Sequence, residues 1–121
     1  MKMVKTRREL VIMGIIANIF SKGRAHAVET PTIKELIRNG ALVIDVRSGG
    51  EFSGGQIKGA INIPHDQISA LIVQHETDKS RCIIVYCLSG MRSSAAKKTL
   101  EKLGYTNVVN GGTFKQMQNI R

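Results

Sequence analysis

The chain has 121 residues, which suits one domain, and its hydrophobic fraction of 42% and charged fraction of 22% are ordinary for a soluble globular protein. The formal net charge of +9 is unevenly spread, because residues 1–27 carry +5 and residues 28–121 carry +4. No basic stripe interleaved with aromatic residues is present, so the composition argues against nucleic-acid binding.

The first 27 residues have the pattern of a secretory signal peptide. A basic start is followed by the apolar run Leu10–Phe20 and by Ala25-His26-Ala27, an A-x-A cleavage pattern. We therefore predict export to the periplasm or elsewhere outside the cytoplasm, cleavage after Ala27, and a mature domain of residues 28–121 without stable membrane association. One alternative is an uncleaved membrane anchor formed by residues 10–20, although spanning a bilayer takes about 20 apolar residues. A first helix of the fold itself is the other alternative.

The next segment predicts a helix followed by a buried strand. Thr32 and Glu35 form a T-x-x-E capping box for a helix that ends at Asn39-Gly40. Ala41–Val46 is an apolar run interrupted only by Asp45, which is typical of a strand in a parallel sheet. An acidic residue inside such a run indicates a buried, hydrogen-bonded carboxylate more than a surface ion pair.

Glycine-rich sequence follows this strand. Ser48–Gly50 and Gly54-Gly55 lack the spacing of phosphate-binding loops, so we predict a flexible connection. Ala60–Ile63 is predicted to be a second short strand. Asp66 is predicted to cap a helix that runs to about Gln74.

The second half of the chain repeats the alternation of strand and helix. Cys82–Tyr86 is the most hydrophobic strand, and a tight loop, Cys87–Arg92, leads into a helix from Ser93 to Leu103. A last strand at Asn107–Val109 and a last helix at Thr113–Ile120 complete the pattern. Strands that alternate with helices predict an α/β fold, here a small parallel sheet with helices on both faces.

Cys87 lies at the carboxyl end of the most apolar strand, where ligands of open α/β sheets bind. Gly90 allows a turn that points backbone N–H groups inward, and the following helix adds its partial positive charge. Both effects are expected to lower the pKa of the Cys87 thiol and to favour the reactive thiolate. Cys82 is interpreted as a small core residue. A disulfide with Cys87 is not expected, because the strand between them spans about 16 Å.

The C-x4-R spacing from Cys87 to Arg92 distinguishes two kinds of chemistry. Cysteine phosphatases of this layout use C-x5-R, whose larger ring of amides surrounds a phosphoryl group. The smaller ring matches a sulfur atom bound to sulfur, and its place between an apolar strand and a helix makes the motif specific. The expected binding residues of the loop are Leu88, Ser89, Gly90, Met91 and Arg92.

With these motifs the chain resembles the rhodanese family, and as a single exported domain it is similar to the periplasmic, phage-shock-type rhodaneses. The similarity covers nearly all of Thr32–Gly112. The segments that carry it are Ile44-Asp45-Val46-Arg47 with Glu51-Phe52, Gly55–Pro64, Tyr86–Ser93, and Gly104-Tyr105 with Val108 and Gly111-Gly112.

The resemblance implies that Cys87 becomes persulfidated and that residues 88–92 cradle the persulfide. Asp45 and Arg47 match the Asp-x-Arg of the family, a pair that supports the active loop by charge and hydrogen bonding. Gln56 stands where the family usually has His, and Phe114 roughly where Trp is common. The loss of the histidine is expected to affect stability more than activity.

The leading hypothesis is a thiosulfate sulfurtransferase. The Cys87 thiolate takes a sulfane sulfur from thiosulfate or a persulfide, a small anionic donor, and passes it to cyanide or a thiol. Arg92 and backbone amides are expected to stabilise the negative charge. No cofactor is implied, and His65 and His75 lack metal-ligand spacing. The alternatives are a sulfur carrier that serves one protein partner and an enzyme acting on arsenate or phosphate esters, against which the loop size argues.

Overall fold

A computed structural model gives the arrangement of residues 31–120. The predicted signal peptide, its cleavage after Ala27 and the alternative anchor at residues 10–20 lie outside this range. Export and the start of the domain at residue 28 therefore stay predictions. Within residues 31–120, no helix combines the length and the apolar character needed to cross a bilayer.

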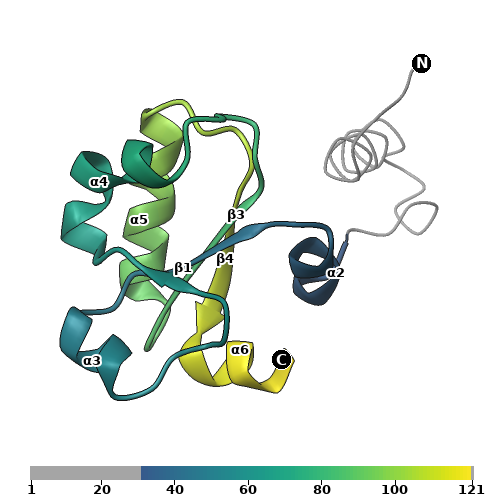
Figure 1. The fold of residues 1–121 in the computed structure, drawn as a ribbon, viewed down its shortest axis with the longest axis vertical. Helices are drawn as coiled ribbons and strands as arrows, with labels where there is room; N and C mark the ends of the chain where they lie inside the picture. The colour runs from purple at the N-terminus through teal and green to yellow at the C-terminus, as the bar shows by residue number, and fades with distance from the viewer. Residues whose placement is uncertain (1–30, 121) are drawn as a thin grey trace.

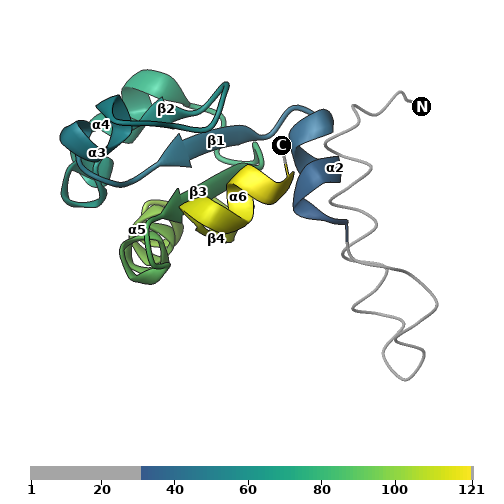
Figure 2. The same ribbon diagram turned by 90° about the horizontal axis from the view of Figure 1, so that it is seen from below.

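Four parallel strands form the centre of the fold and confirm the predicted α/β class. They are β1 (Leu42–Asp45), β2 (Ile61–Asn62), β3 (Ile83–Cys87) and β4 (Val108–Thr113). Their order is β2-β1-β3-β4, as Figure 2 shows. Every residue of β3 is buried, which explains why its sequence is a continuous apolar run.

Helices cover both faces of the sheet (Figure 1). On one face, α4 (Ile68–His75) and α5 (Met91–Lys102) pack against side chains of β1 and β3. On the other face, α2 (Ile33–Arg38) and α6 (Phe114–Ile120) do the same. The predicted T-x-x-E capping box of α2 is present.

The alternation of side chains along β3 separates two neighbouring residues. Ile83, Val85 and Cys87 belong to the core under α4 and α5, whereas Ile84 and Tyr86 belong to the core under α2 and α6. The side chains of Cys87 and Tyr86 therefore lie on opposite faces of the sheet.

The prediction of a flexible glycine-rich connection after β1 is wrong. Residues Gly49–Ser53 form a short helix, α3. The Ser48 hydroxyl accepts a hydrogen bond from the Glu51 N–H at 3.2 Å, and the Glu51 carboxylate accepts one from the Ser48 N–H at 3.0 Å. This capping box stabilises a helix turn in spite of the two glycines.

The predicted cap at Asp66 is also wrong. A 3₁₀ turn, His65–Gln67, precedes α4. The N-cap residue of this turn is Pro64, which makes no side-chain capping hydrogen bond. Proline holds φ near the helical value and starts the turn two residues before Asp66. Asp66 thus lies inside the turn, and α4 runs from Ile68 to His75.

The helix after the cysteine begins at Met91, two residues before the predicted start at Ser93. Gly90 is its N-cap and has a positive φ of 98°, a conformation that glycine adopts without steric cost. Cys87 is the last residue of β3, so the segment between strand and helix contains only residues 88–90.

Strand β4 is longer than predicted and continues through Gly111 and Gly112. The pairing with β3 shifts at this point, since Val85 pairs with Asn110 and Tyr86 with Gly112. Gly111 is therefore the extra residue of a β-bulge. A Cβ at this position would lie 2.9 Å from side-chain atoms of Ile84 and Met117, so the close packing of α6 requires glycine.

Candidate functional site

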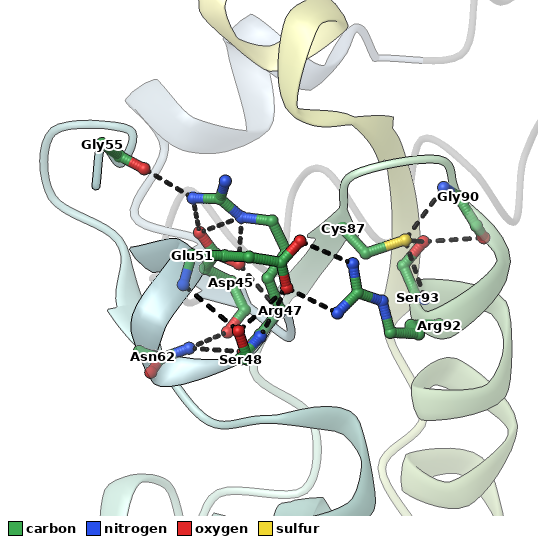
Figure 3. A network of polar contacts seen from close by, with 10 residues as sticks. All are labelled: Asp45, Arg47, Ser48, Glu51, Gly55, Asn62, Cys87, Gly90, Arg92 and Ser93. Carbon is green, nitrogen blue, oxygen red and sulfur yellow. Dashed lines mark hydrogen bonds and ion pairs between the residues drawn. The ribbon is translucent and has the colours of Figure 1, made fainter. Parts of the chain in front are cut away.

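The Cys87 side chain is fully buried at the carboxyl end of β3. Its sulfur accepts a hydrogen bond from the N–H of Gly90 at 2.8 Å and from that of Ser93 at 3.4 Å, and it lies 3.6 Å from the Ser93 hydroxyl oxygen (Figure 3). The turn at Gly90 thus aims amide groups at the sulfur, as the sequence predicted.

The pKa of Cys87 is lowered from its ordinary value. Burial by itself would raise this pKa, because desolvation disfavours the charged thiolate. Hydrogen bonds from the Ser93 side chain and from the backbone amides of Ser93, Gly90 and Ser89 outweigh that effect. The N-terminus of α5, which begins at Met91, adds a favourable dipole. The arrangement favours a thiolate.

Ser93 belongs to a small polar network that the sequence did not reveal. Its hydroxyl oxygen lies 2.9 Å from the Gly90 carbonyl oxygen and 2.9 Å from Oδ1 of Asn110. The same Asn110 oxygen accepts a hydrogen bond from the Gly112 N–H at 2.8 Å. A hydroxyl carries one proton, so Ser93 donates to one of its neighbours at a time, and the thiolate competes for that proton.

Arg92 is held by an ion pair with Glu51. One guanidinium nitrogen donates to Oε1 at 2.7 Å and another donates to Oε2 at 3.0 Å, which joins the first turn of α5 to α3 (Figure 3). The side-chain hydrogen bond from Arg92 and the backbone hydrogen bond from Ser48 lower the pKa of Glu51 to about 2. Glu51 was not predicted as a site residue, and the S-x-x-E spacing from Ser48 to Glu51 is the signal that could have identified its helix cap.

Asp45 and Arg47 form a buried ion pair on the other face of β3. The Nε of Arg47 lies 3.0 Å from both carboxylate oxygens, and its Nη2 donates to Oδ2 at 2.6 Å. The Tyr86 hydroxyl donates to the same oxygen at 2.8 Å. Desolvation and this hydrogen bond raise the pKa of Tyr86. The predicted buried and hydrogen-bonded carboxylate at Asp45 is confirmed.

Arg47 connects this ion pair to its surroundings. Its guanidinium lies 4.2 Å from the centre of the Phe114 ring and donates to the carbonyl oxygen of Gly55 at 2.6 Å. Phe114 in turn stacks on Tyr86, the residue before Cys87, with ring centroids 6.3 Å apart. The contacts of the pair thus support the end of β3 and the start of α6, while Arg92 and Glu51 brace the loop itself.

Two loop residues predicted to bind substrate have exposed apolar side chains. Leu88 is 55% exposed and Met91 is 79% exposed, although both flank a fully buried sulfur. Ser89 is exposed as well, and its backbone amide contributes to the low pKa of Cys87. The backbone N–H groups of the loop thus stabilise the sulfur, whereas Leu88, Ser89 and Met91 are exposed to solvent.

Solved structures share this fold. A rhodanese with anions from E. coli is 37% identical, with a TM-score of 0.59 over 63% of this chain and 89% of that chain. The human single-domain sulfurtransferase TSTD1 is 25% identical, with a TM-score of 0.60 over 69% of this chain and 86% of that chain.

Curated relatives include proteins of different activities. Thiosulfate sulfurtransferase PspE of Escherichia coli is 38% identical over 61% of this chain and 71% of the relative. The uncharacterized protein YqhL of Bacillus subtilis is 43% identical over 63% of this chain and 60% of its own length. A tRNA uridine(34) hydroxylase of Yersinia pestis is 27% identical, and the match spans only 34% of that protein.

Residues 29–115 match the family described as Rhodanese-like domain. This match covers most of the chain and includes the cysteine loop, α3 and both residues of the buried ion pair. It supports chemistry of the sulfurtransferase type without fixing the donor or the acceptor. The chain belongs to the rhodanese-like family.

Proposed function

We propose that this protein is a sulfurtransferase that carries a sulfane sulfur on Cys87. The donor is thiosulfate or a persulfide, and the acceptor is cyanide or a thiol. The observation that carries the proposal is the set of N–H groups around the sulfur, with Gly90 N–H at 2.8 Å and Ser93 N–H at 3.4 Å. Such a set stabilises both a thiolate and the terminal sulfur of a persulfide anion.

In the first step, the Cys87 thiolate attacks the outer sulfur of the donor. A new sulfur–sulfur bond forms to Cys87, and the bond between the outer sulfur and the rest of the donor breaks. The electron pair leaves with sulfite when the donor is thiosulfate, or with a thiolate when the donor is a persulfide. No proton has to be moved, because nucleophile and leaving group are both anions.

In the second step, the acceptor attacks the outer sulfur of the Cys87 persulfide. Cyanide takes this sulfur as thiocyanate and the electron pair of the broken bond restores the Cys87 thiolate. The two half-reactions share one enzyme form, so ping-pong kinetics are expected.

Arg92 acts in this proposal chiefly by holding the loop. Its two hydrogen bonds to Glu51 fix the first turn of α5, in which the Ser93 N–H donates to the sulfur. The positive charge of Arg92 still contributes to the local potential, although Glu51 compensates much of it. Asp45 and Arg47 position the strand that ends in Cys87, and we assign them no contact with substrate.

A thiocyanate assay with matched cysteine variants tests the proposal. Cys87→Ala should abolish thiocyanate formation from thiosulfate and cyanide, and its circular dichroism spectrum should match that of the wild type. Cys82→Ala is the control, because Cys82 is also buried but lies at the other end of the strand. Sulfur transfer by Cys87→Ala at the rate of the Cys82→Ala control would refute the proposal. Persulfide formation without thiocyanate release would indicate a sulfur carrier.

We also propose export, on the signal-peptide pattern of residues 1–27. Expression of the full chain in a bacterial host, followed by N-terminal sequencing of the protein from the periplasmic fraction, tests it. The expected first residue is Val28. Recovery of the intact N-terminus with the membrane fraction would indicate the anchor at residues 10–20.

A further inference from the structure

We propose that the preferred sulfur donor of Cys87 carries an apolar organic group, as an organic persulfide or an organic thiosulfonate does. This inference rests on the proposed function and narrows its substrate class. It is drawn from the two exposed apolar side chains beside the buried sulfur and from the compensated charge of the cysteine loop.

The exposed apolar side chains of Leu88 and Met91, here called the apolar rim, belong to the loop that surrounds Cys87. Leu88 directly follows the cysteine, and Met91 directly follows Gly90, whose N–H is hydrogen-bonded to the sulfur. Because the sulfur is fully buried, a donor must insert its outer sulfur past this loop while the rest of the donor stays at the surface. The part that stays outside then lies within reach of the apolar rim.

The apolar rim holds the two most exposed of the large apolar side chains in the described part of the chain. Within residues 31–120, the large apolar side chains that stay exposed are those of Val73, Leu88, Met91 and Leu103, and the two in the cysteine loop have the highest exposed fractions. Apolar groups exposed beside a buried reactive atom gain free energy when a ligand covers them. Methionine in particular adapts its shape to different apolar partners.

The charges of the loop also favour an organic donor over thiosulfate. Arg92 is the one charged side chain in residues 87–93, and its guanidinium is bound by both carboxylate oxygens of Glu51. The dianion thiosulfate would find amide dipoles in this loop but no side-chain cation whose charge is left uncompensated. A monoanion with a carbon substituent needs less compensation and contacts the apolar rim.

The chemical step is the one proposed above with a different leaving group. For a thiosulfonate, the Cys87 thiolate attacks the outer sulfur and forms the new sulfur–sulfur bond. The bond from that sulfur to the sulfonyl sulfur breaks, and its electron pair leaves on an organic sulfinate. The two negative charges at the start are balanced by those of the persulfide anion and the sulfinate.

The experiment compares two probes of equal charge, benzenethiosulfonate and methanethiosulfonate, with cyanide as the acceptor. The quantity measured is the ratio of their kcat/KM values, so differences in enzyme concentration cancel. Dividing the ratio of a variant by that of the wild type also removes the intrinsic reactivity of the probes. We expect the double variant Leu88→Ser/Met91→Ser to lower the benzene-to-methane ratio about tenfold.

Two further variants sharpen the comparison. Val73→Ser removes an apolar side chain that is 52% exposed on α4, away from the cysteine loop, and should leave the ratio unchanged. Met91→Lys adds a cation to the rim and should raise kcat/KM for thiosulfate about fivefold while lowering it for benzenethiosulfonate.

A benzene-to-methane ratio that stays within about twofold of the wild-type value in the double variant would overturn this inference. Transfer from methanethiosulfonate or thiosulfate would in that case still uphold the proposed function. If instead no donor of any kind places sulfur on Cys87, the proposed function itself fails. The two failures are therefore distinguishable in one set of assays.

Discussion

The two faces of the sheet at the end of β3 carry different kinds of polar contacts, although Cys87 and Tyr86 are neighbours in the sequence. The cysteine face, formed by Cys87, Gly90, Ser93 and Asn110, surrounds one sulfur with backbone and hydroxyl donors. The ion-pair face, formed by Asp45, Arg47, Tyr86 and Phe114, pairs buried charged groups with each other and with aromatic side chains. On the cysteine face the hydrogen-bond donors stabilise the reactive thiolate. On the ion-pair face each named group has another named group as its partner.

This comparison separates positioning from chemistry. Changes on the ion-pair face should cost mainly stability, because they leave a buried charge without its partner. Changes on the cysteine face should alter mainly the pKa and the reactivity of Cys87, since its donors are few and specific. Asp45→Asn and Ser93→Ala test this division directly, while Gly111→Ala and Glu51→Gln test the β-bulge and the ion pair that brace the two faces. The four variants follow from the largest expected effect to the smallest.

Asp45→Asn should destabilise the protein by about 3–5 kcal/mol, because Arg47 would keep a buried charge without a carboxylate. Urea unfolding followed by circular dichroism measures this loss. The double variant Asp45→Asn/Arg47→Met should lose less than the single variant, as it removes the uncompensated charge. A single variant as stable as the wild type would mean that the pair does not hold the fold together.

Gly111→Ala should cost about 1–3 kcal/mol, since the new methyl group would overlap Ile84 and Met117 at 2.9 Å. The matched control is Gly50→Ala in α3, where the nearest atom to a new Cβ is 4.0 Å away. This control should be as stable as the wild type or slightly more stable. Equal midpoints of thermal unfolding for Gly111→Ala and Gly50→Ala would argue against a tight bulge.

Ser93→Ala should raise the pKa of Cys87, because the thiolate loses a hydroxyl hydrogen bond. The thiolate fraction at neutral pH then falls, and the rate of alkylation by iodoacetamide falls with it. The pH at which that rate reaches half of its maximum gives the pKa of Cys87. Ser94→Ala is the control, because Ser94 is exposed and bonds Asn110 rather than the sulfur. The same pKa of Cys87 in both variants would show that the Ser93 hydroxyl does not stabilise the thiolate.

Glu51→Gln should have the smallest effect on stability, about 1 kcal/mol or less, because the ion pair with Arg92 is partly exposed. The pKa of Glu51 is lowered from 4.5 to about 2 in the folded protein, so its contribution is present above pH 4.5 and is lost as the pH falls toward 2. Stability measured across this range should decline less steeply in Glu51→Gln than in the wild type. An unchanged slope would show that Glu51 does not titrate as described.

The sequence predicted the parts of this molecule that depend on local pattern. The apolar runs around Ile44 and Ile84 predicted the two central strands because burial on both faces leaves no other composition. The turn at Gly90 predicted the amide groups at Cys87, since a strand, a glycine and a helix N-terminus follow one another directly.

The sequence could not predict the contacts that join distant segments. Glu51 and Arg92 lie 41 residues apart, and their ion pair depends on α3, a short helix whose two glycines hid its capping box. Asn110 reaches Ser93 only because a bulge at Gly111 shifts the pairing of β4. The exposure of Leu88 and Met91 likewise became visible only once the loop was placed.

The intact mass of the purified chain, before and after thiosulfate and again after cyanide, tests the central claim most directly. We predict that thiosulfate adds one sulfur atom to Cys87 and that cyanide removes it with one equivalent of thiocyanate. Cys82→Ala should gain the same mass, and Cys87→Ala should gain none. If the wild type gains no sulfur from thiosulfate, a persulfide or a thiosulfonate, Cys87 is not a sulfur carrier and the assignment of this site is wrong.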